Sequence, residues 1–154
     1  MAQFAQFLIS GGFAQGVTHY QDRYPGEEYS ARVVLPVTVE GCLSVPAIVD
    51  TGAPWCVIDP EIARRVGTAV RAGYEPAKRL MVRGTLYEGR LLRMGISLEA
   101  EQGDSLEIDA TVFVPMLSPS DPWPHPNFVG LDGFLNRIRF AVDPGENAFY
   151  FGPV

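Results

Sequence analysis

The sequence predicts a mainly β domain with one or two short helices. Several segments are rich in β-branched residues or alternate between apolar and polar ones, and turns containing glycine or proline separate them. Residues 59–67 instead carry the start and stop signals of a helix. With 154 residues, 47% of them apolar, the chain is long enough for one domain with a sizeable core.

Residues 1–30 are predicted to be an N-terminal extension, and residues 31–154 to be the folded domain. The extension is rich in Gly, Gln and Tyr without sustained periodicity, although a short strand is expected near residues 15–20. Its start has neither a basic leader nor a long apolar run, so we expect no signal peptide and no membrane helix. A cytoplasmic location is the default expectation.

The first half of the domain is expected to hold a hairpin and a helix, followed by a loop at residues 68–79. Residues 31–40 and 43–49 form the hairpin, turned at Gly41, with Pro36 marking an edge or a bulge. The helix is one or two turns long. Its signals are an N-cap, a first-turn proline and acidic residue, two basic residues and a terminal glycine: Asp59, Pro60, Glu61, Arg64, Arg65 and Gly67.

The second half begins with a predicted hairpin at residues 80–94. Gly84 and Gly89 flank its tip, and glycines at both shoulders let a hairpin bend without strain. The remaining elements are two strands at residues 95–100 and 106–114, joined by a turn at residues 101–104. A stiff proline-rich loop at residues 115–126 and a final hairpin at residues 138–152 follow.

The segment most informative about function is residues 46–58. An apolar run ends at Asp50, Thr51-Gly52-Ala53 turns the chain, and a second apolar run follows. Burying a lone charge is costly unless it is hydrogen-bonded, so a carboxylate at the end of a buried strand is a candidate functional group. The alternative is an Asp-Thr-Gly turn whose side chain only caps its own loop.

This segment resembles the active-site loop of aspartic proteases, and Ala53 makes it most similar to the retropepsin branch. That family pairs the loop with a later element, two apolar residues and a glycine, which threads beside the loop and precedes a short helix. Residues 128–135 fit this pattern. The resemblance covers residues 31–152 and implies a closed, mostly antiparallel β barrel with a flap hairpin over a cleft.

The resemblance also implies an aspartic endopeptidase that acts as a homodimer. Neither Asp132 nor Asp143 lies in a second Asp-Thr-Gly, so one chain carries half of the catalytic pair. Asp50 would act as base or acid on a water, with no cofactor, and Gly52 would offer its N–H to the carboxylates. The Thr51 hydroxyl would reach across the dimer axis.

Substrate-binding residues are expected, by resemblance, in the Asp50 loop, the flap and the second motif. They are Ala53, Trp55, Gly84, Thr85, Leu86, Tyr87, Phe128, Val129 and Gly130. Apolar cleft walls without fixed charge predict cleavage between apolar residues of a peptide or protein. The residues expected to form these walls are Trp55, Val57, Leu86, Tyr87, Phe128 and Phe134.

The aromatic last strand, residues 148–152, has no obvious later partner. We expect it to be an exposed edge that helps to join two chains, because unpaired strand edges pair with other chains. The viral retropepsins also have an Asp after the Asp-Thr-Gly-Ala and an Arg after the second-motif Gly, which pair. This chain has Pro54 and Leu131 at those positions, so that ion pair cannot form.

Charge and cysteine content exclude several other classes. A net charge of −6 and a pI near 4.8 argue against nucleic acid or an anionic membrane as partner. Cys42 and Cys56 are too few for a disulfide framework and lack ligand neighbours for a metal, so we expect buried thiols and no metal site.

Two other functions remain open from the sequence. The chain could be a non-catalytic retropepsin-like module that binds a peptide or a partner, with Asp50 serving only in loop hydrogen bonds. It could also be a structural β domain with a chance motif. The intact Asp-Thr-Gly favours the enzyme.

Overall fold

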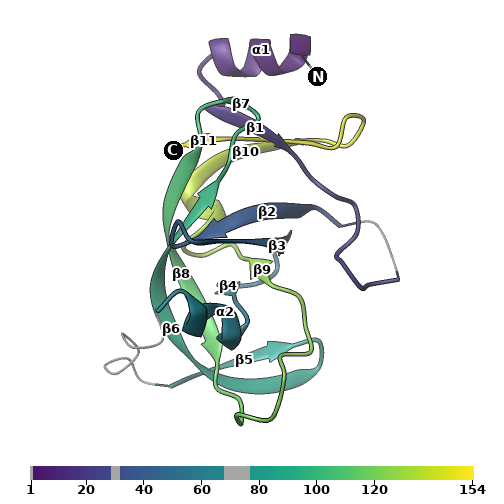
Figure 1. Cartoon of the computed structure of the whole chain (residues 1–154). Helices are drawn as coiled ribbons and strands as arrows, with labels where there is room; N and C mark the ends of the chain where they lie inside the picture. Colours follow the sequence, from purple (N-terminus) through teal and green to yellow (C-terminus); the bar gives the residue numbers. More distant parts are fainter. Residues whose placement is uncertain (1, 29–31, 68–76) are drawn as a thin grey trace.

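The computed structural model describes residues 2–28, 32–67 and 77–154. Within them the chain is mainly β and forms a closed barrel with a second, smaller sheet at one end (Figure 1). Most of the loop expected at residues 68–79 lies outside the described residues. The mainly β class and the closed, mostly antiparallel barrel are confirmed.

Six strands close the barrel, because its first strand pairs with its last. Their order around the ring is β2 (Val34–Val39), β3 (Leu43–Val49), β9 (Phe128–Val129), β4 (Cys56–Val57), β8 (Leu106–Pro115) and β6 (Thr85–Leu98). The β3–β9 and β4–β8 pairs are parallel, and the other pairs are antiparallel. A further strand, β5 (Lys78–Val82), pairs with β6 and projects as a hairpin.

The smaller sheet joins the two ends of the chain. Its order is β10 (Ile138–Asp143), β11 (Ala148–Pro153), β1 (Gly16–His19) and β7 (Gln102–Gly103). The strand expected near residues 15–20 is therefore confirmed as β1. It pairs with β11 over its whole length. The domain boundary at residue 31 stays a prediction.

The expectation that the aromatic last strand is an exposed edge is wrong. β11 lies between β10 and β1, and Phe149, Tyr150 and Phe151 are each 0% exposed. The partner comes from the opposite end of the chain, which local sequence patterns cannot show. β11 offers no free edge for a second chain.

Two helices flank the sheets. α1 (Ala2–Ser10), which the sequence did not indicate, lies beyond the smaller sheet in Figure 1, and its Phe4 ring meets Tyr150 edge-on at 5.6 Å. α2 (Pro60–Arg65) confirms the expected helix, with the Asp59 carboxylate accepting from the Glu61 N–H at 2.8 Å. The short helix expected after the second motif is a single 3₁₀ turn, η2 (Leu135–Arg137).

The strands differ from the expected ones in two places. β6 runs unbroken through Gly95, so the second strand of the hairpin expected at residues 80–94 and the strand expected at residues 95–100 are one strand, which pairs with β8 from Gly89 to Leu98. Residues 102–103, expected in a turn, pair with β1 as β7. The pairing of β2 with β6 starts at Val37, so Pro36 has no partner in β6. The missing N–H of Pro36 therefore leaves no gap in that ladder.

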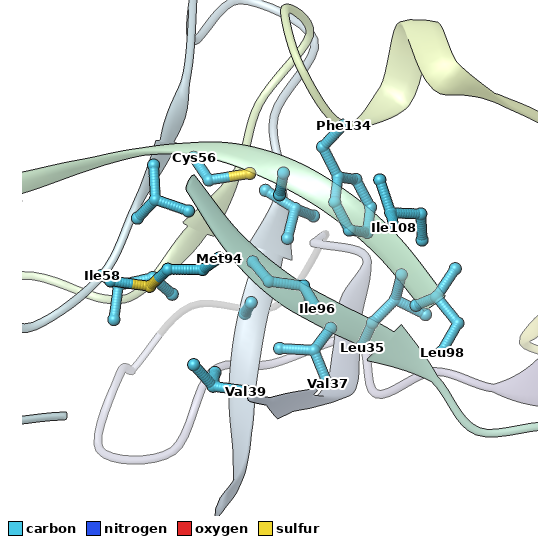
Figure 2. Close-up of a cluster of buried hydrophobic side chains, with 14 of the residues drawn as sticks. Leu35, Val37, Val39, Cys56, Ile58, Met94, Ile96, Leu98, Ile108 and Phe134 are labelled. Carbon is cyan, nitrogen blue, oxygen red and sulfur yellow. The ribbon is translucent and has the colours of Figure 1, made fainter. Parts of the chain in front are cut away.

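The barrel interior is filled by aliphatic side chains from facing strands (Figure 2). Successive residues of β2 point alternately into and out of the barrel, so Leu35, Val37 and Val39 all point inward. Cys56 and Phe134 complete this core. Removing these side chains from water stabilises the barrel by about 25 cal/mol per Å² of apolar area, and so fixes the strand ends that carry the loops.

The two cysteines have opposite environments. Cys56 is 0% exposed in the barrel core, and burial raises the pKa of its thiol to about 12. Cys42 is exposed, so the expectation of two buried thiols is wrong for this residue, which follows the turn at Gly41.

We expect iodoacetamide to alkylate one thiol of the native protein and two of the unfolded protein. Only a thiolate attacks the reagent, and the Cys56 thiol is both covered and protonated at neutral pH. Mass spectrometry of peptides from the treated protein checks this. Labelling of Cys56 at the rate of Cys42 in folded protein would contradict the buried position.

Candidate active site

The barrel delivers Asp50 at the end of β3, into a tight loop. The Asp50 N–H donates to the Val129 carbonyl at 3.0 Å, and the Ala53 N–H donates to the Asp50 carbonyl at 3.2 Å. The Gly52 N–H donates to Asp50 Oδ1 at 2.9 Å. The carboxylate is therefore held in one orientation by its own loop and is partly buried.

The second motif clamps this loop from the other side. β9 lies between β3 and β4, and beyond it the Leu131 N–H donates to the Ala53 carbonyl at 2.8 Å. Gly130 passes so close that a Cβ there would lie 2.2 Å from the Trp55 carbonyl oxygen. The expected threading of the second motif beside the loop is confirmed.

A buried amide that the sequence did not single out fixes this arrangement. Asn127, just before β9, is 4% exposed, and its Oδ1 accepts from the Asp59 N–H at 2.9 Å. Its Nδ2 donates to the Pro46 carbonyl at 3.2 Å and to the Tyr24 hydroxyl at 3.3 Å. One side chain thus joins β3, the α2 N-cap and the N-terminal segment. The sequence feature that could have indicated this role is the position of Asn127 directly before the second motif.

We expect Asn127→Ala to lower the free energy of unfolding by about 1–3 kcal/mol, because it leaves buried partners at Asp59 and Pro46 unsatisfied. Tyr24→Phe is the comparison variant: it keeps the ring and removes the hydroxyl that accepts two 3.3 Å bonds from Asn127, while the bonds to Asp59 and Pro46 remain, so its effect should be smaller than that of Asn127→Ala. Urea unfolding measures both. Equal effects would show that the amide is not the shared anchor.

A cleft of about 860 Å³ opens in front of Asp50. Its walls come from the Asp50 loop, the barrel floor, the β5–β6 hairpin, the N-terminal segment and the β10–β11 turn. The residues that line it include Asp22, Arg32, Ile48, Asp50, Gly52, Ala53, Val57, Leu80, Met81, Val82, Arg83 and Phe128. The hairpin contributes four consecutive residues, 80–83, so it occupies the place expected for a flap.

The site residues expected from the sequence divide into three groups. Asp50, Gly52, Ala53 and Phe128 line the cleft, and Thr51 is exposed on the same loop. Val129 and Gly130 are buried behind it, where they hold the loop by main-chain contacts. The flap residues and Trp55 lie outside the lining: Trp55, Gly84, Thr85, Leu86 and Tyr87.

The aromatic residues expected in the wall have other contacts. Trp55 stacks on Phe113 with ring centroids 6.3 Å apart. The Tyr87 hydroxyl bonds to His125 Nε2 at 2.9 Å, against the proline-rich loop. Phe134 is in the barrel core. These rings are drawn into packing because each can bury more surface there than at a solvated cleft.

The expectation of cleft walls without fixed charge is wrong. Arg32, Arg83 and Asp22 line the same cleft as Asp50. Two of them, Asp22 and Arg32, precede β2, in a part of the chain where the sequence patterns predicted no site residue. The cleft therefore offers charged as well as apolar contacts to a ligand.

The flap tip differs from the expected one. Arg83 (φ 48°) and Gly84 (φ 85°) form a two-residue turn between β5 and β6. Gly89 lies inside β6, paired with Lys78 on one side and Pro115 on the other. A Cβ at Gly89 would meet Phe113 Cζ at 2.5 Å. Gly89 is thus a packing glycine, and its expected role as a flexible shoulder is wrong.

We expect Gly89→Ala to lower the free energy of unfolding by about 1–3 kcal/mol, since the added methyl overpacks against Phe113. Gly95→Ala in the same strand is the control, because there the nearest atoms belong to the flexible Glu107 side chain at 3.3 Å, and its effect should stay within about 0.5 kcal/mol. Thermal unfolding compares them. A Gly89→Ala protein as stable as the parent would contradict this packing.

Two classes of site receive no support from the described residues. Within residues 2–28, 32–67 and 77–154, no group of three or more His, Cys, Asp or Glu side chains could hold a metal ion. No helix in that part of the chain is long and apolar enough to cross a membrane.

No family model matches the chain, and no curated protein does. Two retropepsin-like domains are among the solved structures that share its fold. A retropepsin-like aspartic protease from Rickettsia conorii has a TM-score of 0.55 at 14% identity, over 90% of this chain and 94% of that one. The retroviral protease-like domain of Ddi1 from Leishmania major has a TM-score of 0.52 at 18% identity, over 79% and 94%. The chain therefore has a retropepsin-like fold.

Proposed function

We propose that the protein is an aspartic endopeptidase that acts as a homodimer with one site on the two-fold axis. The observation that carries the proposal is Asp50, whose carboxylate lies in an 860 Å³ cleft and is oriented by the Gly52 N–H at 2.9 Å. The loop that bears it is clamped by β9, so its geometry is fixed before any substrate arrives.

A single chain supplies one such carboxylate from an Asp-Thr-Gly, so the chemistry needs a second copy. Thr51, Gly52 and Pro54 are exposed beside Asp50, and Leu131 next to them is 45% exposed. A partner loop approaching this face would bury them and bring the two carboxylates together. The apolar Pro54 and Leu131 would stand where the viral enzymes have an ion pair.

In the proposed dimer the two Asp50 carboxylates are too close for both to ionise, so they share one proton. The ionised one takes a proton from a water held between them, and the oxygen attacks the peptide carbonyl carbon. The other gives its proton to the carbonyl oxygen. When the tetrahedral intermediate collapses, the C–N bond breaks, and the leaving amine takes the proton that the first carboxylate had removed from the water. A hydroxyl of the intermediate returns its proton to the second carboxylate.

The substrate would be a peptide or an unfolded segment of a protein. Ile48, Val57, Leu80 and Phe128 give the cleft apolar walls that favour apolar side chains next to the scissile bond. A cytoplasmic location is part of the proposal, and the exposed Cys42 thiol suits a reducing compartment.

We expect Asp50→Asn to abolish cleavage of a mixed peptide library without changing the dimer or the unfolding temperature. Asn is nearly isosteric and can still accept from the Gly52 N–H, but it cannot exchange a proton. Asp104→Asn, an exposed carboxylate outside the cleft, is the matched control and should keep full activity. Mass spectrometry follows the products, and sedimentation follows the assembly.

Activity of Asp50→Asn within about tenfold of the parent, a barrier change of only ~1.4 kcal/mol, would mean that the chemistry lies elsewhere. A chain that cuts peptides while remaining monomeric at high concentration would overturn the shared site. A dimer that binds peptides and never cuts them would instead identify a binding module.

A further inference from the structure

The tip of the β5–β6 hairpin carries a residue that the turn itself does not favour. Arg83 has φ 48°, in the left-handed region where Gly, Asn and Asp are the usual residues of a two-residue hairpin turn. A non-glycine residue held there costs of order 1 kcal/mol and persists when the surroundings fix it.

Arg83 joins the hairpin tip to two other parts of the cleft. Its Nη1 donates to Glu27 Oε1 at 2.6 Å, and its guanidinium lies 5.9 Å from the centre of the Phe128 ring. Phe128 is on β9, opposite Ile48 and Val57, and forms part of the cleft floor. One side chain therefore connects the flap, the floor and the N-terminal segment.

The Glu27 end of this contact is anchored to the barrel. The Glu27 N–H donates to the Tyr24 carbonyl at 3.0 Å, and the Tyr24 hydroxyl accepts from both the backbone N–H and the Nδ2 of Asn127 at 3.3 Å. Upstream, Gln21 bridges to Val34 at the start of β2. Figure 1 shows this segment on the same side of the barrel as the hairpin tip.

The hairpin end of the contact has one apolar anchor next to the turn, Val82, which is 6% exposed and packs in the same cluster as Phe128. β6 pairs with β8 only from Gly89 onward, so residues 85–87 pair with β5, and the Glu88 carbonyl also accepts from the Met116 N–H at 2.8 Å. A two-stranded ribbon is marginally stable in water by itself. Tyr87 is held by His125, but it lies several residues from the turn. Arg83 thus carries the tertiary contact nearest the tip among those seen in the described residues.

The Glu27–Arg83 ion pair is also less exposed to solvent than the Arg79–Glu88 ion pair of this hairpin. The Glu27 and Arg83 side chains are 23% and 40% exposed, whereas Glu88 and Arg79 are 57% and 69% exposed at a longer 3.3 Å. Partial burial reduces screening, and Arg83 holds the pKa of the Glu27 carboxyl below its usual range. The Arg79–Glu88 pair therefore provides an internal control.

We propose that Glu27 is a positioning residue that latches the tip of the β5–β6 hairpin over the cleft floor, through Arg83, in the free protein. The latch closes one side of the cleft, so an extended peptide can pass between flap and floor only after the pair separates. The effect on catalysis rests on the proposed function, whereas the effect on the hairpin does not.

Hydrogen exchange of the backbone amides at residues 82–86, followed in the intact chain, tests the latch directly. Glu27→Gln keeps the shape of the side chain and removes its charge, so these amides should exchange about fivefold faster or more. Glu88→Gln removes the exposed pair of the same hairpin and should leave their exchange within about twofold of the parent. Amides of β8 report that the barrel is intact in both.

Arg83→Gln should loosen the same amides, and the Glu27→Gln/Arg83→Gln double variant should add little to either single change, because both remove one contact. Unchanged exchange in Glu27→Gln with an intact barrel would overturn the latch. Equal loosening by Glu88→Gln would do so as well, since it would show a general effect of charge on the hairpin.

Measurements of KM and kcat connect the latch to the proposed function. If opening limits entry, Glu27→Gln should lower KM several-fold and change kcat by less than about twofold, since the chemistry at Asp50 is untouched. A raised KM would contradict a latch that opposes entry. If the parent cuts no peptide, the proposed function fails, while the exchange experiment still decides the latch.

Discussion

Main-chain hydrogen bonds between the Asp50 loop and residues 127–132 are the constraint on which the site depends. Ile48 donates to the Asn127 carbonyl at 2.8 Å and Asp50 to the Val129 carbonyl at 3.0 Å, while Leu131 and Asp132 donate back to Ala53 and Pro54, both at 2.8 Å. The loop cannot shift without breaking this ladder. Backbone bonds tolerate almost any side chain, which explains how the fold persists at 14–18% identity to its structural neighbours.

The N-terminal segment changes how the cleft is bounded. β1 covers the edge of β11, and the residues after it line the cleft and pair with the hairpin tip through Glu27. The N-terminal segment thus protects a sheet edge and supplies polar contacts at the site. Because β11 has no free edge, the proposed dimer would form through another surface, such as the exposed face around Thr51 and Leu131.

Charge in the cleft has consequences for what could bind there. Apolar walls reward any apolar side chain in proportion to its buried area, which gives affinity with little discrimination. Arg32, Arg83 and Asp22 add groups that must stay paired or solvated when a ligand enters. Selection among peptides would therefore depend on how a ligand satisfies these groups as well as on how much apolar surface it buries.

The sequence by itself determined the elements whose causes are local. The helix at Asp59, the placement of Pro36 where β2 has no partner in β6 and the Asp-Thr-Gly turn follow from capping, a missing N–H and a hydrogen bond between near neighbours. Two motifs in the right order also indicated the barrel, since together they specify a strand that threads beside a loop.

Only the tertiary structure decided which distant segments meet. The pairing of β1 with β11, the packing of Gly89 on Phe113 and the contact of Glu27 with Arg83 join residues that no periodicity relates. Each depends on closing a long loop, whose entropic cost is repaid by burial and pairing summed over the whole fold. A short stretch of sequence shows neither the entropy lost on closing such a loop nor the burial and pairing that offset it. The residues that line the cleft could therefore be identified only from the folded structure.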